Sequence, residues 1–131
     1  MRILIVEDDL TSRELLREFL EPHGSCDFAV DGRLAIDAFS AALKRGPYDL
    51  ICMDIMMPNM DGQAALKEIR EIESREGIEK SREVKVIMTT ALCDPKSITE
   101  AFYSGGASSY IVKPINQEQL YEKLRKFGLI K

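Results

Sequence analysis

The sequence has little cysteine, and the few cysteines present match no structural framework. Cys26, Cys52 and Cys93 are odd in number and widely spaced, and no zinc-ligand spacing appears among them. Two of them fall in apolar runs, so we expect reduced core thiols in a cytoplasmic protein.

Long hydrophobic runs and an excess of basic charge are also missing. No segment approaches membrane-spanning length, and the apolar run at residues 3–6 is too short for a signal peptide. The 18 Lys and Arg residues against 22 Asp and Glu give a net charge of -4, which offers no broad basic surface to nucleic acid or anionic lipid. Membrane insertion and direct DNA binding are therefore disfavoured.

Strand and helix patterns alternate along the 131 residues. Apolar runs predict strands at 3–6, 26–30, 49–53, 84–89 and 109–112. Helical spacing follows each strand. Thr11 or Ser12 can cap the first helix, and later helices are predicted to start after Asp31, near Gly62, near Pro95 and at Asn116. This alternation predicts a doubly wound α/β domain of flavodoxin-like type: a five-stranded parallel sheet of order 2-1-3-4-5, flanked by five helices.

Polar residues gather where four of the predicted strands end. They are Glu7 with Asp8, Asp54, Thr89 with Thr90, and Lys113. Because ligands bind beyond the carboxyl ends of the strands in such sheets, we expect these side chains to converge. Pro58, Asp61 and Gly62 force the chain out of the sheet soon after Asp54, which leaves that carboxylate in a loop.

Three neighbouring carboxylates repel one another unless a cation lies among them. Oxygen ligands at an accessible edge suit Mg²⁺, which takes one or two carboxylates and a phosphate. A lysine and a hydroxyl beside such an ion equip the site for a phosphoryl group. Asp54 is the natural nucleophile, and its attack on phosphorus would form an acyl phosphate.

Four motifs resemble those of receiver domains of two-component response regulators, of the single-domain, CheY-like chemotaxis-regulator type. They are ILIVEDD at Ile3 to Asp9, DLICMDIMMPNMDG at Asp49 to Gly62, IMTTA at Ile87 to Ala91, and GGASSYIVKP at Gly105 to Pro114. The resemblance covers the whole chain, so it implies that residues 1–131 form a single receiver domain with the CheY-like fold.

The resemblance also implies a role for each acidic site residue. Asp54 would accept a phosphoryl group from a histidine kinase or phosphotransfer protein. Asp8 would bind Mg²⁺ directly, Glu7 directly or through water, and the backbone carbonyl of Met56 would complete the protein ligands, together with Asp54.

On the other strands, the resemblance implies that Thr90, which precedes the small Ala91, hydrogen-bonds the phosphoryl group, and that Thr89 is a strand residue. Lys113 would pair with the phosphoryl group, and the peptide that joins it to Pro114 would be cis. Tyr110 matches an aromatic switch position whose side chain turns inward when Thr90 moves toward the phosphate.

The implied function is a phosphorylation-activated switch that docks a target protein through helix 4, strand 5 and helix 5, as a monomer or as a phosphorylation-dependent dimer. His23, the sole histidine, lies at a helix end and is expected at the surface, so the phosphoryl group must come from another protein. Gly128 is a plausible helix stop, after which Leu129 and Ile130 can fold back, and we expect no effector domain to follow.

Two other classes of protein compete with the switch. A Mg²⁺-dependent phosphatase of the haloacid dehalogenase kind also forms an aspartyl phosphate, but its chemistry wants a second acid two residues after the nucleophile, where this chain has Met56. A phosphate-independent interaction module on the same fold would have no need to keep every acidic, hydroxyl and lysine residue of the site.

Three further expectations concern single segments. Met56 and Leu92 flank the route by which water would reach the acyl phosphate, and both are apolar, so we predict slow self-dephosphorylation. Asp9 is expected to cap the first helix. Residues 71–85 carry many charges of both signs and are expected to form a solvated helix end and a long loop, without an assigned role.

Overall fold

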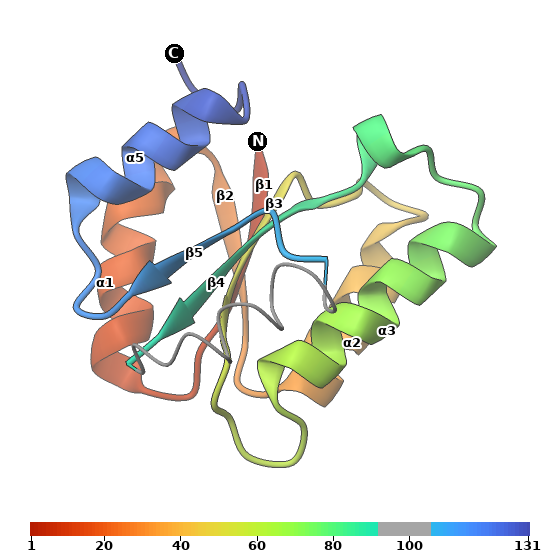
Figure 1. Ribbon diagram of the computed structural model, residues 1–131, viewed down its shortest axis with the longest axis horizontal. Helices are drawn as coiled ribbons and strands as arrows, with labels where there is room; N and C mark the ends of the chain where they lie inside the picture. Colours follow the sequence, from red (N-terminus) through yellow and green to blue (C-terminus); the bar gives the residue numbers. More distant parts are fainter. Residues whose placement is uncertain (92–105) are drawn as a thin grey trace.

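The apolar runs of the sequence form one parallel sheet in the computed structural model, which describes residues 1–91 and 106–131. The strand order is β2-β1-β3-β4-β5, as predicted (Figure 1). The strands are β1 (Arg2–Val6), β2 (Ser25–Ala29), β3 (Leu50–Asp54), β4 (Lys85–Thr90) and β5 (Ser109–Val112). Their bounds match the predicted runs to within one residue, and β3 and β4 each extend one residue further than predicted, to include Asp54 and Thr90.

Helices cover both faces of the sheet (Figure 1). They are α1 (Leu10–Leu20), α2 (Gly32–Ala42), α3 (Gly62–Arg75) and α5 (Gln117–Lys126), with short 3-10 turns η1 (Glu21–His23) and η2 (Lys80–Arg82). The helix predicted near Pro95 lies outside the described residues, as do Leu92, Cys93 and Gly105. Among the helices of the described ranges, none is both long and apolar enough to cross a membrane.

The hydrophobic core lies in two layers because side chains alternate between the faces of each strand. On β1, Ile3 and Ile5 pack with residues of α1 and α5, whereas Leu4 and Val6 pack with residues of α2 and α3. All five residues of β3 are buried, as expected of a central parallel strand covered on both sides.

Each described α-helix begins at a capping side chain that accepts the backbone N–H of the residue three positions later. The caps are Asp9, Asp31, Asp61 and Asn116. The prediction that Thr11 or Ser12 caps α1 is wrong, while the expected cap role of Asp9 is confirmed. Asp9 takes the position because its carboxylate accepts both the N–H and the hydroxyl of Ser12, and these bonds lower the pKa of Asp9.

The carboxyl end of α5 folds back as predicted. Gly128 adopts a φ of 74°, a conformation that glycine reaches without steric cost. The Leu129 N–H then donates to the Leu124 carbonyl at 2.9 Å, which is the arrangement of a Schellman cap. Leu129 and Ile130 pack against the core layer beneath α1 and α5.

The predicted solvation of residues 71–85 is wrong at Glu73, which is 1% exposed. Its carboxylate accepts the Val84 N–H at 2.8 Å and the Arg70 guanidinium at 2.7 Å. Arg70 also donates to the carbonyls of Val84 and Gly106. A buried charge persists here because both of its oxygens have partners.

Candidate functional site

The carboxyl ends of the strands meet at one edge of the sheet, at the bottom of Figure 1. Glu7 directly follows β1. Because side chains alternate along a strand, Glu7 lies on the same face as Ile3 and Ile5, which is the face covered by α1 and α5. Asp54 ends β3 and is paired in register with Thr89 of β4. Because parallel strands point the same way, residues far apart in the sequence reach this edge together.

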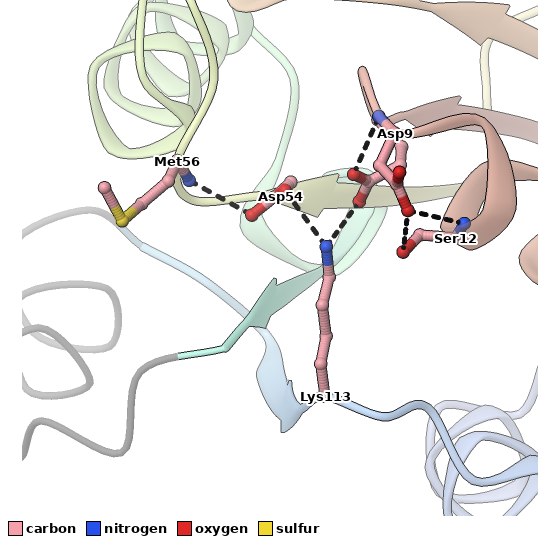
Figure 2. Close-up of polar contacts among 6 residues, drawn as sticks. Asp9, Ser12, Asp54, Met56 and Lys113 are labelled. Carbon is pink, nitrogen blue, oxygen red and sulfur yellow. Dashed lines mark hydrogen bonds and ion pairs between the residues drawn. The ribbon is translucent and has the colours of Figure 1, made fainter.

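Lys113 joins the two buried carboxylates of the site. Its Nζ lies 3.0 Å from Glu7 Oε2. The same Nζ lies 3.1 Å from Asp54 Oδ2 (Figure 2). Glu7 is 0% exposed and Asp54 is 7% exposed. Burial by itself lowers the pKa of Lys113, but the bonds to Glu7 and Asp54 outweigh it and the net pKa is raised, so the ammonium is charged.

The acidic residues fit a divalent cation. Glu7, Asp8 and Asp54 each offer one carboxylate oxygen, and these oxygens all lie within 4.8 Å of one another. Burial first, and the neighbouring Asp54 charge next, raise the pKa of Glu7 against the opposing effect of Lys113. Asp8 is exposed and gives the cluster access to solvent. This donor set consists of oxygen alone, which is the chemistry that Mg²⁺ prefers.

The loop after β3 turns back toward Asp54. The Met56 N–H donates to Asp54 Oδ1 at 3.1 Å (Figure 2), and the Gly62 N–H closes the loop by donating to the Ile55 carbonyl at 2.8 Å. A side chain at position 62 has no room, because a Cβ there would lie 2.3 Å from the Asp54 carbonyl oxygen. The Met56 side chain points outward and is 62% exposed.

The hydroxyl and aromatic residues lie on the neighbouring strands. Thr90 ends β4 and is 1% exposed, and its carbonyl accepts the Lys113 N–H at 2.7 Å. The peptide between Lys113 and Pro114 is cis, as the resemblance implied. Tyr110 lies on β5, half-buried against the core layer beneath α2 and α3, with the Lys123 Nζ 5.9 Å from its ring centroid.

Sequence reasoning missed one contact beside the site. The Asn59 side-chain amide donates to Asp31 Oδ2 at 2.9 Å, across 28 sequence positions. Both residues are turn formers, and nothing else in the sequence indicated that they would meet.

A hollow of about 1200 Å³ lies at the opposite edge of the sheet, between the carboxyl ends of α2, α3 and α5. Tyr48 and Phe127 are among the residues that line it, and it takes no part in this site.

Comparison with known proteins agrees with this geometry. A family model described as the response regulator receiver domain matches residues 3–125. The chemotaxis protein CheY of Bacillus subtilis is 32% identical over 127 residues, which cover 95% of this chain and 95% of that protein.

Solved structures are also similar. A CheX–CheY–BeF3–Mg complex from Borrelia burgdorferi has a TM-score of 0.83 at 26% identity and covers 100% of this chain and 90% of that chain. The complex of the Saccharomyces cerevisiae phosphotransfer protein Ypd1 with the receiver domain of Ssk1 has a TM-score of 0.83 at 30% identity, covering 98% and 88%.

The doubly wound sheet and the acidic pocket at its switch point fit the class of receiver domains that the comparisons identify. The chain belongs to the response regulator receiver domain family. It is a receiver domain of two-component phosphorelay signalling, and its Glu7, Asp8 and Asp54 pocket is typical of a phosphoacceptor site. The chain spans only 7% to 46% of the length of four other curated relatives, at 35% or 36% identity.

Proposed function

We propose that Asp54 is the phosphoacceptor and that Glu7, Asp8, Asp54 and the Met56 carbonyl hold Mg²⁺. The observation that carries this proposal is the convergence of two further acids and one ammonium on the Asp54 carboxylate. The Met56 N–H and the Lys113 ammonium both bind the Asp54 carboxylate and orient it. Glu7 is held in a similar way by the Asp9 N–H and Lys113, but it is 0% exposed, whereas Asp54 is 7% exposed and is the more accessible of the two buried acids.

The bound ion would neutralise charge on the phosphoryl oxygens during transfer. The chain's own groups do the rest. The Met56 N–H fixes one oxygen of Asp54, and the other attacks phosphorus in line with the leaving group. A bond forms between that oxygen and phosphorus while the bond to the donor nitrogen breaks, and the electron pair leaves with the donor imidazole. Lys113 pairs with the transferred group, and Thr90 hydrogen-bonds it.

The donor we propose is a histidine kinase or a phosphotransfer protein. The similarity to the Ssk1 receiver domain, which was solved together with the phosphotransfer protein Ypd1, supports a partner of this kind. His23 is the only histidine of the chain, and it packs edge-on against Tyr121 at 4.8 Å, which supports a donor from outside.

For output we propose docking of a target protein on the surface formed by helix 4, β5 and α5, controlled by Thr90 and Tyr110. Helix 4 falls outside the described ranges. Tyr110 lies between the core and Lys123 of α5, which supports a position from which it can change that surface. The similarity to a CheY solved with CheX supports a protein target.

We also propose a cytoplasmic location, because Cys26 and Cys52 are free thiols.

The phosphatase alternative lacks support at one position. Residue 56, two after the nucleophile, is a methionine whose side chain faces solvent, so it offers no acid to a leaving group. A phosphate-independent module is disfavoured because Lys113 and two buried carboxylates are costly to keep together without a function.

Incubation with acetyl phosphate and Mg²⁺, followed by intact mass, tests the proposal. We expect one added phosphoryl group, which is lost in Asp54→Asn and retained in Asp37→Asn, a matched change at an exposed acid of α2. Continuous turnover of excess acetyl phosphate would instead indicate a phosphatase, and an unchanged mass would indicate the phosphate-independent module.

A further inference from the structure

One side-chain pair fastens the loop of residues 55–61 to the start of α2. The Asn59 amide donates to Asp31 Oδ2 at 2.9 Å, while Asp31 Oδ1 accepts the Leu34 N–H at 2.9 Å. Asp31 is 7% exposed, and the Leu34 bond, followed by the Asn59 bond, lowers its pKa and keeps it ionised. A single buried carboxylate therefore serves both the helix cap and the loop.

The backbone conformation at Asn59 and the glycine that follows Asp31 both allow the loop to approach α2 closely. Asn59 adopts a φ of 68°, a left-handed conformation that asparagine tolerates better than most residues. At the facing position, a Cβ on Gly32 would lie 2.7 Å from the Met60 carbonyl oxygen, so glycine permits the close approach of loop and helix. The tip of the loop is thus seated against α2.

The same loop carries the groups that serve the acidic pocket. Its base is closed by the bond from Gly62 N–H to the Ile55 carbonyl, and the Met56 N–H contacts Asp54. Met56 lies between the closed base and the seated tip. Its backbone is consequently restrained from both ends of the loop.

We propose that Asp31 and Asn59 are positioning residues for the metal site, whose hydrogen bond holds the Met56 backbone where it serves both Asp54 and the ion. This inference rests on the proposed function, because it assumes that the Met56 carbonyl is a ligand. Mg²⁺ demands near-ideal octahedral geometry, so a carbonyl ligand on a free loop binds it less well than one that is already in place.

Removing the pair without disturbing the backbone tests this role. Asn59→Gly keeps a residue that accepts positive φ, and Asp31→Ser keeps an oxygen for the Leu34 N–H but is too short to reach Asn59 as well. We expect either change to raise the dissociation constant for Mg²⁺ by about 3- to 10-fold, somewhat less than the loss seen when a direct partner of a ligand is removed. The readout is titration of the unphosphorylated protein with MgCl2, followed by the amide NMR signals of Ile55 and Met56.

A reversed pair separates positioning from simple loss of stability. Asn59→Asp alone places two carboxylates together and should weaken Mg²⁺ binding, whereas Asp31→Asn with Asn59→Asp restores a hydrogen bond of opposite direction and should return the dissociation constant to within about twofold of the original. Phosphorylation by acetyl phosphate in the single variants should recover at saturating Mg²⁺, as expected of positioning residues rather than catalytic ones.

Single variants with unchanged Mg²⁺ affinity, or a reversed pair as weak as Asn59→Asp alone, would overturn the inference while the proposed function stands. Absence of Mg²⁺ binding and of phosphorylation in the original protein would overturn the proposed function and this inference together.

Discussion

At the scale of single residues, the charges of the pocket explain why it suits a divalent ion. Glu7, Asp8 and Asp54 contribute three carboxylates, and Lys113 contributes one ammonium. When all four are ionised, two negative charges remain, which one Mg²⁺ neutralises. The Lys113 ammonium offsets part of the repulsion between Glu7 and Asp54, and a divalent ion would offset the negative charge that remains in this buried site.

Met56 sets a prediction on the lifetime of the acyl phosphate. Its side chain is apolar and 62% exposed beside Asp54, so it offers no polar group that could orient a water molecule for attack on the acyl phosphate. Met56→Asn should shorten the lifetime by roughly threefold or more, and more strongly when it is combined with Leu92→Glu. Loss of phosphate measured by intact mass after removal of the donor checks this, with Met56→Leu as the control. An equal decay rate in all the variants would contradict the prediction.

Tyr48 gives a prediction on pH. Burial, and then the 2.6 Å bond from its hydroxyl to Asp27 Oδ2, raise its pKa to about 12. A free tyrosine ionises near pH 10, so the folded state keeps a proton that the unfolded state loses between these values. The contribution of Tyr48 to stability is therefore complete below about pH 10 and declines as the pH rises toward 12.

In an ultraviolet titration with rising pH, we expect one tyrosine to ionise at a higher pH than the others, and Tyr48→Phe should remove that step. The same variant should flatten the alkaline loss of thermal stability. Titration of all tyrosines near the usual pKa would refute the assignment.

At the scale of elements, the Arg70 and Glu73 pair fastens α3 to the strands beside it. Glu73→Gln should lower the free energy of unfolding by about 3 kcal/mol, because the amide leaves Arg70 partly buried without its counter-ion. Chemical denaturation measures this change. The exposed pair of Arg17 with Glu14 is the control, and Glu14→Gln should cost about 0.5 kcal/mol or less. Equal costs at the two sites would count against a structural role for Glu73.

Most elements follow from local patterns in the sequence. The runs that became β1 and β3 are apolar on both faces because both faces are covered, and Asp61 and Asn116 cap helices where their residue types predict caps. The sequence also predicted that Glu7, Asp54 and Lys113 converge, because the carboxyl ends of parallel strands lie at the same edge of a sheet.

What could not be predicted depends on loop conformation or on pairing across elements. The Asn59 and Asp31 contact exists only because Asn59 adopts positive φ, which no periodic pattern encodes. Glu73 lies four residues after the buried Ile69, a spacing that places it on the apolar face of α3. Because Glu73 is charged, the sequence pattern nevertheless predicted an exposed residue.

At the scale of the whole molecule, Mg²⁺ should stabilise the fold, because the unfolded chain has no assembled site. At an Mg²⁺ concentration about ten times the dissociation constant, the gain is about 1.4 kcal/mol, or a few degrees in the thermal midpoint. Thermal melts with MgCl2 and with a chelator measure it. Asp8→Asn should reduce the gain, and an undiminished gain in that variant would place the ion elsewhere.

The Lys113 contacts also bear on how the protein is made. The ammonium reaches Glu7 across 106 positions and Asp54 across 59, so the pocket draws on both ends of the chain and on its middle. Synthesis at the ribosome supplies β5 last, and chain segments with such distant partners come together late in folding. A nascent or clipped polypeptide that lacks β5 therefore has no Lys113 in the pocket, and under the proposed function its phosphate uptake would report that the chain has folded as far as β5.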